Sequence, residues 1–282
     1  GLKSESEKFA GAVDTYCIEA MMGDKKALQA GTSHYLGQNF ARAFDVKFQD
    51  DNNKEQYVYA TSWGVSTRLI GAIIMAHGDD KGLRLPPAIA PIQVVVIPIT
   101  RSDDDGELIN SYLDPLVKSL KQNGIRVHID DRKKMSPGFK FNEWEMKGVP
   151  VRLEVGPRDM KQNSVFLARR DTSEKFGVEI AEASSKIINL LDEIQNNLFD
   201  QALAFREKNT FSVNTYDEFK TIVEKGGFIR CGWDGDAKTE EAVKNETKAT
   251  IRVIPFDENP EGLMCIYSGK PAKHEVIFSK AY

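Results

Sequence analysis

The sequence has few of the residues that mark disulfide-bonded or membrane-spanning proteins. Its three cysteines, Cys17, Cys231 and Cys265, are too few and too scattered over 282 residues for a disulfide framework. The longest apolar stretches, such as Ile92–Ile99, fall well short of the roughly 20 residues that a membrane helix needs. The N-terminal GLKSESEK contains no apolar signal core. These absences predict a cytoplasmic protein without a membrane segment.

A strong charge of one sign is also missing. The chain has 38 Lys and Arg against 42 Asp and Glu, a formal net charge of −4, so composition alone does not indicate nucleic-acid binding. Residues 126–170 differ, because eleven Lys and Arg stand there against six Asp and Glu. This local excess permits an anionic partner.

What is present is a globular composition, 41% hydrophobic and 28% charged, with room for about two domains. The patterns predict three segments and a mixed α/β and α+β fold. Residues 1–89 are expected to form an antiparallel sheet with helices, residues 90–208 an α/β domain that ends in a long helix, and residues 209–282 a compact α+β module.

Hydrophobic periodicity and turn residues place the elements of these segments. The expected strands are Val13–Met22, Ala27–His34, Lys47–Gln49, Tyr57–Trp63, Gln93–Ile97, Ile125–Ile129, Val149–Val155, Ser164–Ala168, Phe228–Gly232, Thr250–Ile254, Met264–Tyr267 and Glu275–Phe278. The expected helices are Asn39–Phe44, Ser66–His77, Glu107–Asn123, Ser136–Lys147, Gly177–Lys208, Tyr216–Lys225 and Asp236–Glu246.

Arg68 begins an apolar helix directly after a predicted strand, among the small residues of Gly64–Gly71. Its planar guanidinium can pair with phosphate oxygens or stack on a base. The alternative is a helix-capping arginine on the surface, or one that pairs with Asp79 or Asp80.

A second polar cluster is the run Thr32, Ser33 and His34, at the end of a predicted strand. Two hydroxyls and an imidazole in a row suit a small ligand with an amine and a carboxylate. The alternative is a hydrogen-bonded loop whose histidine is satisfied internally.

Longer motifs carry a family resemblance. The stretches Lys8–Ala12 (KFAGA), Ile18–Ala20 (IEA), Ala27–Phe40 (ALQAGTSHYLGQNF) and Ser62–Gly71 (SWGVSTRLIG) resemble the later half of a prolyl-tRNA synthetase catalytic domain. Residues 62–87 resemble motif 3 of class II aminoacyl-tRNA synthetases. The stretches Lys140–Pro150 (KFNEWEMKGVP) and Leu153–Asp159 (LEVGPRD) resemble the anticodon-binding domain, and residues 227–282 resemble the C-terminal domain of the archaeal- and eukaryote-like form.

The resemblance implies an ATP-dependent proline–tRNA ligase, with Arg68 as the catalytic residue. ATP would be bound with Mg²⁺ by Gln29, Thr32, Ser66 and Arg68, and proline by Phe9, Ser33, His34 and Trp63. Glu19 is either near the phosphates or a strand residue that faces solvent. Proline's carboxylate would attack the α-phosphate of ATP, and prolyl transfer to tRNA(Pro) would follow.

The family's motifs 1 and 2 and its Thr-x-Glu loop would lie before Phe9, so the resemblance predicts a C-terminal fragment that is inactive alone. The full-length protein would be a homodimer. A non-catalytic, synthetase-like protein that binds tRNA or regulates is the alternative.

For the anticodon of tRNA(Pro), the resemblance points to Arg132, Phe139, Lys140, Phe141 and Glu145. Cationic side chains donate to guanine O6 and N7, a carboxylate accepts from guanine N1–H and N2–H, and aromatic rings stack on bases. The alternative is a surface helix with ordinary ion pairs.

For the C-terminal module the resemblance implies four zinc-binding cysteines. Here Cys231 and Cys265 remain, while Asp236 and Ser268 stand at the other two expected positions. Two thiolates with Asp and Ser are a poor zinc site, so we expect no bound metal. The module would then depend on an apolar core, predicted as Phe228, Ile229, Ile251, Val253, Ile254, Ile266, Val276 and Ile277. Tyr282 resembles the family's terminal residue near the active site; a frayed end is the alternative.

Overall fold

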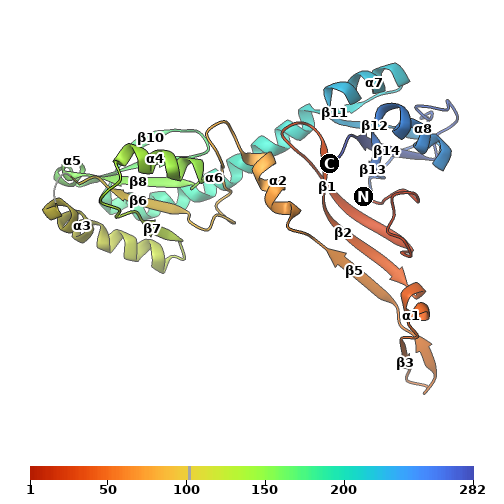
Figure 1. Cartoon of the computed structure of the whole chain (residues 1–282), viewed down its shortest axis with the longest axis horizontal. Helices are drawn as coiled ribbons and strands as arrows, with labels where there is room; N and C mark the ends of the chain where they lie inside the picture. The colour runs from red at the N-terminus through yellow and green to blue at the C-terminus, as the bar shows by residue number, and fades with distance from the viewer. Residues whose placement is uncertain (101–102) are drawn as a thin grey trace. The chain divides into compact units, whose positions relative to one another are not determined.

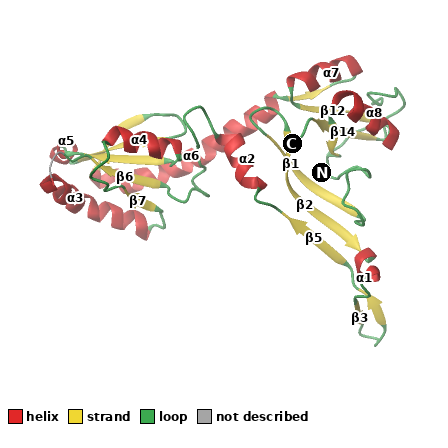
Figure 2. Ribbon diagram, viewed as in Figure 1, coloured by secondary structure: helices red, strands yellow, loops and turns green. Residues whose placement is uncertain are grey.

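The computed structural model describes residues 1–100 and 103–282, which form two compact units. The first unit combines Gly1–Ala76 with Ala204–Tyr282, and the second is His77–Leu203. Figures 1 and 2 show their helices and strands. The mixed helix and strand content, with both antiparallel and mixed sheets, confirms the predicted fold class.

The first unit begins with a three-stranded antiparallel sheet in the order β1-β2-β5. Its strands are β1 (Asp14–Met21), β2 (Ala27–Gly37) and β5 (Ala60–Gly64). The register pairs Tyr16 with Ser33 and Ser33 with Trp63, so these three side chains share one face. A shift between Ile18 and Glu19 marks a bulge, after which Glu19 lies opposite Gln29.

Short elements lie between β2 and β5 and after β5. They are helix α1 (Asn39–Ala43), the hairpin of β3 (Lys47–Gln49) and β4 (Glu55–Tyr57), and helix α2 (Arg68–His77). The prediction of one strand over Tyr57–Trp63 is wrong, because Tyr57 pairs with β3 whereas the strand from Ala60 pairs with β2. The change of partner breaks the strand.

The second unit is built on a mixed sheet in the order β10-β9-β8-β6-β7. The strands are β6 (Val94–Pro98), β7 (Val127–Ile129), β8 (Val151–Val155), β9 (Ser164–Arg169) and β10 (Lys175–Glu179). β6 runs parallel to β7 and β8, while β9 runs antiparallel to both β8 and β10. The helices are α3 (Asp103–Gln122), α4 (Pro137–Met146), α5 (Pro157–Lys161) and α6 (Ile180–Lys208).

Alternation along β6 explains how these helices cover the sheet. Val94 and Val96 pack into a core with α3 and α6, whereas Val95 and Ile97 pack with Trp144 of α4. α3 and α6 therefore cover one face, and α4 covers the other (Figure 1). The long helix begins at Ile180 and not at Gly177, because the preceding residues form β10 against β9.

The C-terminal part of the first unit is an α+β module with the sheet order β11-β12-β14-β13. It contains β11 (Thr210–Ser212), α7 (Tyr216–Lys225), β12 (Phe228–Trp233), α8 (Ala237–Thr247), β13 (Thr250–Val253) and β14 (His274–Ser279). Seven of the eight predicted core residues are buried; Ile277 is partly exposed and Phe278 is fully buried. The strand predicted at Met264–Tyr267 is wrong, because isolated bridges from Met264 and Cys265 replace it.

Backbone pairing joins this module to the N-terminal sheet within the first unit. Leu2 and Ile254 exchange hydrogen bonds of 2.9 and 2.8 Å, and the amide of Ala27 donates to the carbonyl of Lys280 at 2.8 Å. Segments about 250 residues apart in the chain are therefore neighbours in one unit. Among the described residues, a helix long and apolar enough to cross a membrane is not found.

Candidate functional sites

The residues predicted for the nucleotide lie around the start of α2. The guanidinium Nη1 of Arg68 donates to the carbonyl of Gln29 at 3.5 Å, and Ser66 Oγ accepts from the Arg68 amide at 3.4 Å. Thr32 lies on β2 opposite Gly64, the last residue of β5. Ser66 follows Gly64 by two residues. The structure thus brings Gln29, Ser66 and Arg68 together, with Arg68 exposed to solvent.

His34 is part of a hydrogen-bonded aromatic cluster with Phe9. The ring centroids of Phe9 and His34 are 4.7 Å apart. Thr15 Oγ1 lies 3.0 Å from His34 Nδ1 and accepts from the Phe9 amide at 3.1 Å. Nδ1 of His34 therefore has a partner within the fold, and the residue lies in strand β2 and not in a loop.

Ser33 and Trp63 lie on the other face of the same sheet. Ser33 pairs directly with Tyr16 and Trp63, and all three line an open cavity of about 480 Å³ with Ile18, Val65 and Phe256. Trp63 is 80% exposed there. The four residues predicted for proline are therefore divided, with Phe9 and His34 on one face and Ser33 and Trp63 on the opposite one.

Glu19 is buried in an ion cluster. Its carboxylate accepts from Lys3 Nζ at 2.8 Å and from two nitrogens of Arg252 at 3.0–3.1 Å. The alternative of a solvent-facing strand glutamate is wrong, because the Glu19 side chain is 4% exposed. Its partners come from the N-terminal segment and from β13.

In the second unit, Asp130 organises several predicted anticodon residues. Both of its carboxylate oxygens accept from Arg132, and the backbone carbonyl accepts from Lys140 Nζ at 2.9 Å. Trp144 Nε1 donates to Oδ2 at 2.8 Å. The hydrogen bonds from Arg132 hold the pKa of Asp130 well below its usual range, although burial opposes them. Lys140 is itself buried.

A cavity of about 400 Å³ opens beside this cluster, at the carboxyl ends of β6 and β7. Its lining is mostly polar and includes Pro98, Thr100, Asn110, Asp130, Asp131, Arg132, Lys133, Lys134, Ser136 and Lys140. Four cationic side chains stand there against three carboxylates, Asp130, Asp131 and Glu107.

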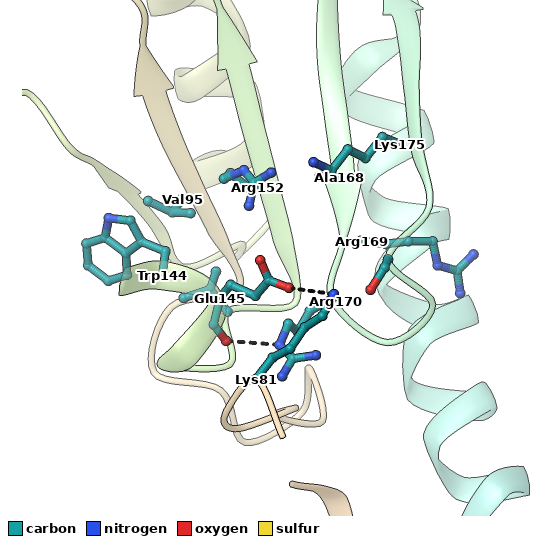
Figure 3. A pocket seen from close by; sticks show the side chains of 11 residues that line it. Lys81, Val95, Trp144, Glu145, Arg152, Ala168, Arg169, Arg170 and Lys175 are labelled. Carbon is teal, nitrogen blue, oxygen red and sulfur yellow. Dashed lines mark hydrogen bonds and ion pairs between the residues drawn. The ribbon is translucent and has the colours of Figure 1, made fainter. Parts of the chain in front are cut away.

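A smaller cavity of about 90 Å³ lies at the other end of α4 (Figure 3). Five of its lining residues are cationic, Lys81, Arg152, Arg169, Arg170 and Lys175, and one, Glu145, is acidic. The carboxylate of Glu145 pairs with Lys81 at 3.4 Å, and its carbonyl accepts from Arg170 Nε at 2.9 Å. Arg152, Arg169 and Arg170 are also paired with carboxylates that do not line the cavity, Glu154, Asp171 and Asp79. Their remaining N–H groups, together with Glu145, suit a ligand with acceptors and donors on the same edge.

Arg152 is held in place at this cavity by two neighbours. Its guanidinium lies over the Phe141 ring, 4.3 Å from the centroid, and Nε donates to Glu154 at 2.8 Å. Sequence reasoning did not name five residues that line this candidate site, Lys81, Arg152, Arg169, Arg170 and Lys175. The charge excess over residues 126–170 includes the three arginines and is the signal that could have found them.

The five residues predicted for the anticodon therefore do not form one cluster. Arg132 and Lys140 line the larger cavity, Glu145 lines the smaller one, and Phe141 lies under Arg152. Phe139, in the first turn of α4, is 52% exposed. α4, which begins after the N-cap Ser136, connects the two cavities.

The four positions considered for zinc do not fit a metal. Cys231 and Cys265 are buried, and burial raises the pKa of the Cys231 thiol. Asp236 Oδ1 accepts from the Lys238 amide at the start of α8, and Ser268 Oγ donates to Asp234 at 2.6 Å. Across the described residues, no group of three or more His, Cys, Asp and Glu is placed to hold a metal ion.

Tyr282 lies at the edge of the N-terminal sheet. Its amide donates to the Ala27 carbonyl at 3.4 Å, and Lys26 Nζ lies 5.0 Å from the ring centroid. Burial and a hydrogen bond to Asp24 raise the pKa of Tyr282 to about 12.

Comparison with known proteins agrees with this architecture. The family profile described as "Anticodon binding domain" matches residues 93–190, and the profile "Prolyl-tRNA synthetase, C-terminal" matches residues 216–282. The whole chain is similar to "Proline--tRNA ligase" of Cytophaga hutchinsonii (54% identity), Parabacteroides distasonis (55%) and Chloroflexus aurantiacus (53%). It spans 57–59% of the length of these relatives. The resemblance inferred from the motifs is confirmed.

Proposed function

We propose that this chain, related over its whole length to proline–tRNA ligases, serves as the part of such an enzyme that binds tRNA(Pro) and contributes to the ATP and proline sites. The observation that carries the proposal is the 54% identity across the entire chain together with the two matched domains. We retain the three-part division into residues 1–89, 90–208 and 209–282 as a proposal. Homodimer formation and a cytoplasmic location are proposed for the complete protein.

The smaller cavity of the second unit is the proposed site for an anticodon base. Glu145 would accept from guanine N1–H and N2–H, and the surrounding cations would donate to O6 and N7. Arg152 is preorganised for this role, since Phe141 and Glu154 already fix its plane. Arg132 and Lys140 at the larger cavity, and exposed Phe139, would contact neighbouring phosphates and bases.

The N-terminal sheet is proposed to hold the reactants for proline activation. Arg68, with Gln29, Thr32 and Ser66, would bind ATP as its Mg²⁺ complex. The rings of Phe9 and His34 would pack against the proline ring. Ser33 and Trp63 lie on the opposite sheet face, which leaves the Phe9 face as the proposed proline site. Proline's carboxylate oxygen would attack the α-phosphorus, and pyrophosphate would leave. A ribose hydroxyl at the tRNA 3′ end would then attack the carbonyl carbon of the adenylate, and AMP would leave.

Catalysis by such a site would depend on positioning and on neutralisation of phosphate charge, which a guanidinium can supply. Arg68 begins the apolar helix α2 and is oriented by the Gln29 carbonyl. A covalent enzyme intermediate is not needed for this reaction, so the buried Cys17 has no proposed chemical role.

The tRNA part of the proposal is tested with this chain and fluorescently labelled tRNA transcripts at one fixed salt concentration. We expect tRNA(Pro) to bind about 10-fold or more tightly than the same tRNA with a replaced anticodon. Arg152→Ala should remove about 10-fold in affinity for tRNA(Pro). Lys118→Ala is the matched control, since Lys118 lies on α3, across the sheet, and pairs with Asp114. Equal affinity for both tRNAs would overturn the proposal.

The catalytic part is tested in the full-length gene product by proline-dependent ATP–pyrophosphate exchange. Arg68→Ala should raise the KM for ATP about 10- to 100-fold. Binding of tRNA(Pro) without exchange in the wild-type protein would instead support the non-catalytic, tRNA-binding alternative.

A further inference from the structure

The N-terminal sheet and the C-terminal module are joined by a buried cluster of three charges. Lys3 Nζ lies 2.8 Å from Glu19 Oε1, and Nε and Nη2 of Arg252 donate to the same carboxylate at 3.0–3.1 Å. The side chains of Lys3, Glu19 and Arg252 are 2%, 4% and 9% exposed. A buried ionic cluster of this kind is often no more stabilising than apolar residues of the same size. Stability alone therefore does not explain why these three charges are buried together.

The geometry of Arg252 is fixed from its own side. Its Nη1 donates to Thr250 Oγ1 at 2.9 Å, within β13, and its carbonyl accepts from Lys3 Nζ at 2.9 Å. The guanidinium therefore offers its Nε and Nη2 edge to Glu19 as a planar fork, which a lysine could not reproduce. Arg252 belongs to the module, whereas Glu19 belongs to β1 of the sheet.

Glu19 occupies a position that matters for the neighbouring strand. It follows the bulge in the β1–β2 pairing and lies directly opposite Gln29. The carbonyl of Gln29 in turn accepts from Arg68 Nη1. A bulge re-aims the residues beside it, so whatever fixes Glu19 also fixes the direction of the Gln29 carbonyl.

We propose that Arg252 is a positioning residue for the nucleotide site: through Glu19 it holds the bulged end of β1 and β2, and thereby the Gln29 carbonyl that orients Arg68. The C-terminal module then contributes to ATP binding without touching the nucleotide. This inference rests on the proposed role of Arg68 in binding ATP.

The test uses ATP–pyrophosphate exchange by the full-length protein, with the KM for ATP and the KM for proline measured separately. Arg252→Gln should raise the KM for ATP about 10- to 100-fold, as expected for a displaced positioning group, and change the KM for proline less than about twofold. Arg252→Lys keeps the buried positive charge but loses the fork, so its KM for ATP should be intermediate. A folded Lys variant keeps the test decisive even where the Gln variant does not fold.

Arg230→Gln is the matched control, because Arg230 lies in the same module sheet but pairs with Asp257 and Glu275 of that module. It should leave both KM values unchanged. Equal rises in both KM values for Arg252→Gln, or an unchanged KM for ATP in both Arg252 variants, would overturn the inference.

The role of Arg68 is checked in parallel. An Arg68→Ala effect on the KM for ATP, without any Arg252 effect, overturns the positioning role alone. An unchanged KM for ATP in Arg68→Ala overturns the proposed nucleotide site, and the positioning role with it.

Discussion

The indole Nε1 of Trp144 donates to Oδ2 of Asp130 at 2.8 Å, so the helix α4 is tied to the end of β7 through a buried carboxylate. The same carboxylate accepts from Arg132, and Lys140 Nζ stands 3.6 Å from its other oxygen. Two side chains predicted to contact tRNA are therefore also engaged within the fold. Their contribution to tRNA binding and to stability has to be measured together.

Asp130→Asn should destabilise the second unit, because it leaves the buried Lys140 without its counter-charge. Removing one partner of a buried ion pair costs about 3–5 kcal/mol, and the amide keeps the bond to Trp144, so we expect about 3 kcal/mol. Urea unfolding followed by tryptophan fluorescence measures the loss. Exposed Asp131→Asn is the control and should change stability by less than about 0.5 kcal/mol. Equal stability of the two variants would contradict the central role of Asp130.

Asp79 should make stability depend on pH in the acid range. Its hydrogen bonds from Arg170, at 2.6 and 2.8 Å, lower its pKa to about 2. A carboxyl whose pKa is depressed in the folded state stabilises it above the unfolded pKa, about 3.9, and this stabilisation is lost as pH falls through the folded value. Because Asp79 is about one-third exposed, we expect no more than about 1 kcal/mol.

The measurement compares urea unfolding of wild type and Asp79→Asn at pH 6 and at pH 2. The difference in stability should be present at pH 6 and largely disappear at pH 2. Asp80→Asn, at the exposed neighbouring residue, serves as the control. A difference that grows toward pH 2 would refute the assignment.

The three cysteines should be unreactive in the native state. Cys17, Cys231 and Cys265 are buried, and burial is the main cause that raises the pKa of the Cys17 and Cys231 thiols. Because the thiolate is the reactive form, an aromatic disulfide reagent should label none of them within minutes at pH 7.5, and all three in guanidinium. Rapid labelling of one thiol in the folded protein would show that its burial is wrong.

Glu145 should decide whether guanine is preferred in the anticodon. Inosine lacks the N2 amine, so replacing an anticodon guanine with inosine should weaken wild-type binding about 10-fold. Glu145→Gln should bind tRNA(Pro) more weakly and lose most of this discrimination. Asp114→Asn, on α3, is the control. If the Glu145 variant still distinguishes guanine from inosine, the anticodon base does not bind at Glu145. The larger cavity would then be the next candidate.

Local patterns predicted most elements, including the bounds of α7, because capping residues and periodicity are encoded in neighbouring positions. The sequence patterns do not predict β10, because its last three residues, Gly177–Glu179, directly precede α6 and extend the apolar periodicity of that helix. Phe9 and His34 lie on the opposite sheet face from Ser33 and Trp63. This separation depends on strand register, which the motifs alone do not determine. Glu19 meets Arg252 across 233 residues, and pairings at such separation follow from packing of whole elements.

The discontinuous first unit has a consequence for how the protein is made. Residues 77–203 form a contiguous unit, so their contacts with one another can form as soon as they have left the ribosome. Residues 1–76 cannot complete their pairings until residues 204–282 have been made, because Leu2 pairs with Ile254 and Ala27 with Ala281. Domains generally fold as units, N-terminal first, during synthesis. Within the first unit this order cannot hold for residues 1–76, since their pairing with residues 204–282 has to wait until the whole second unit has been made.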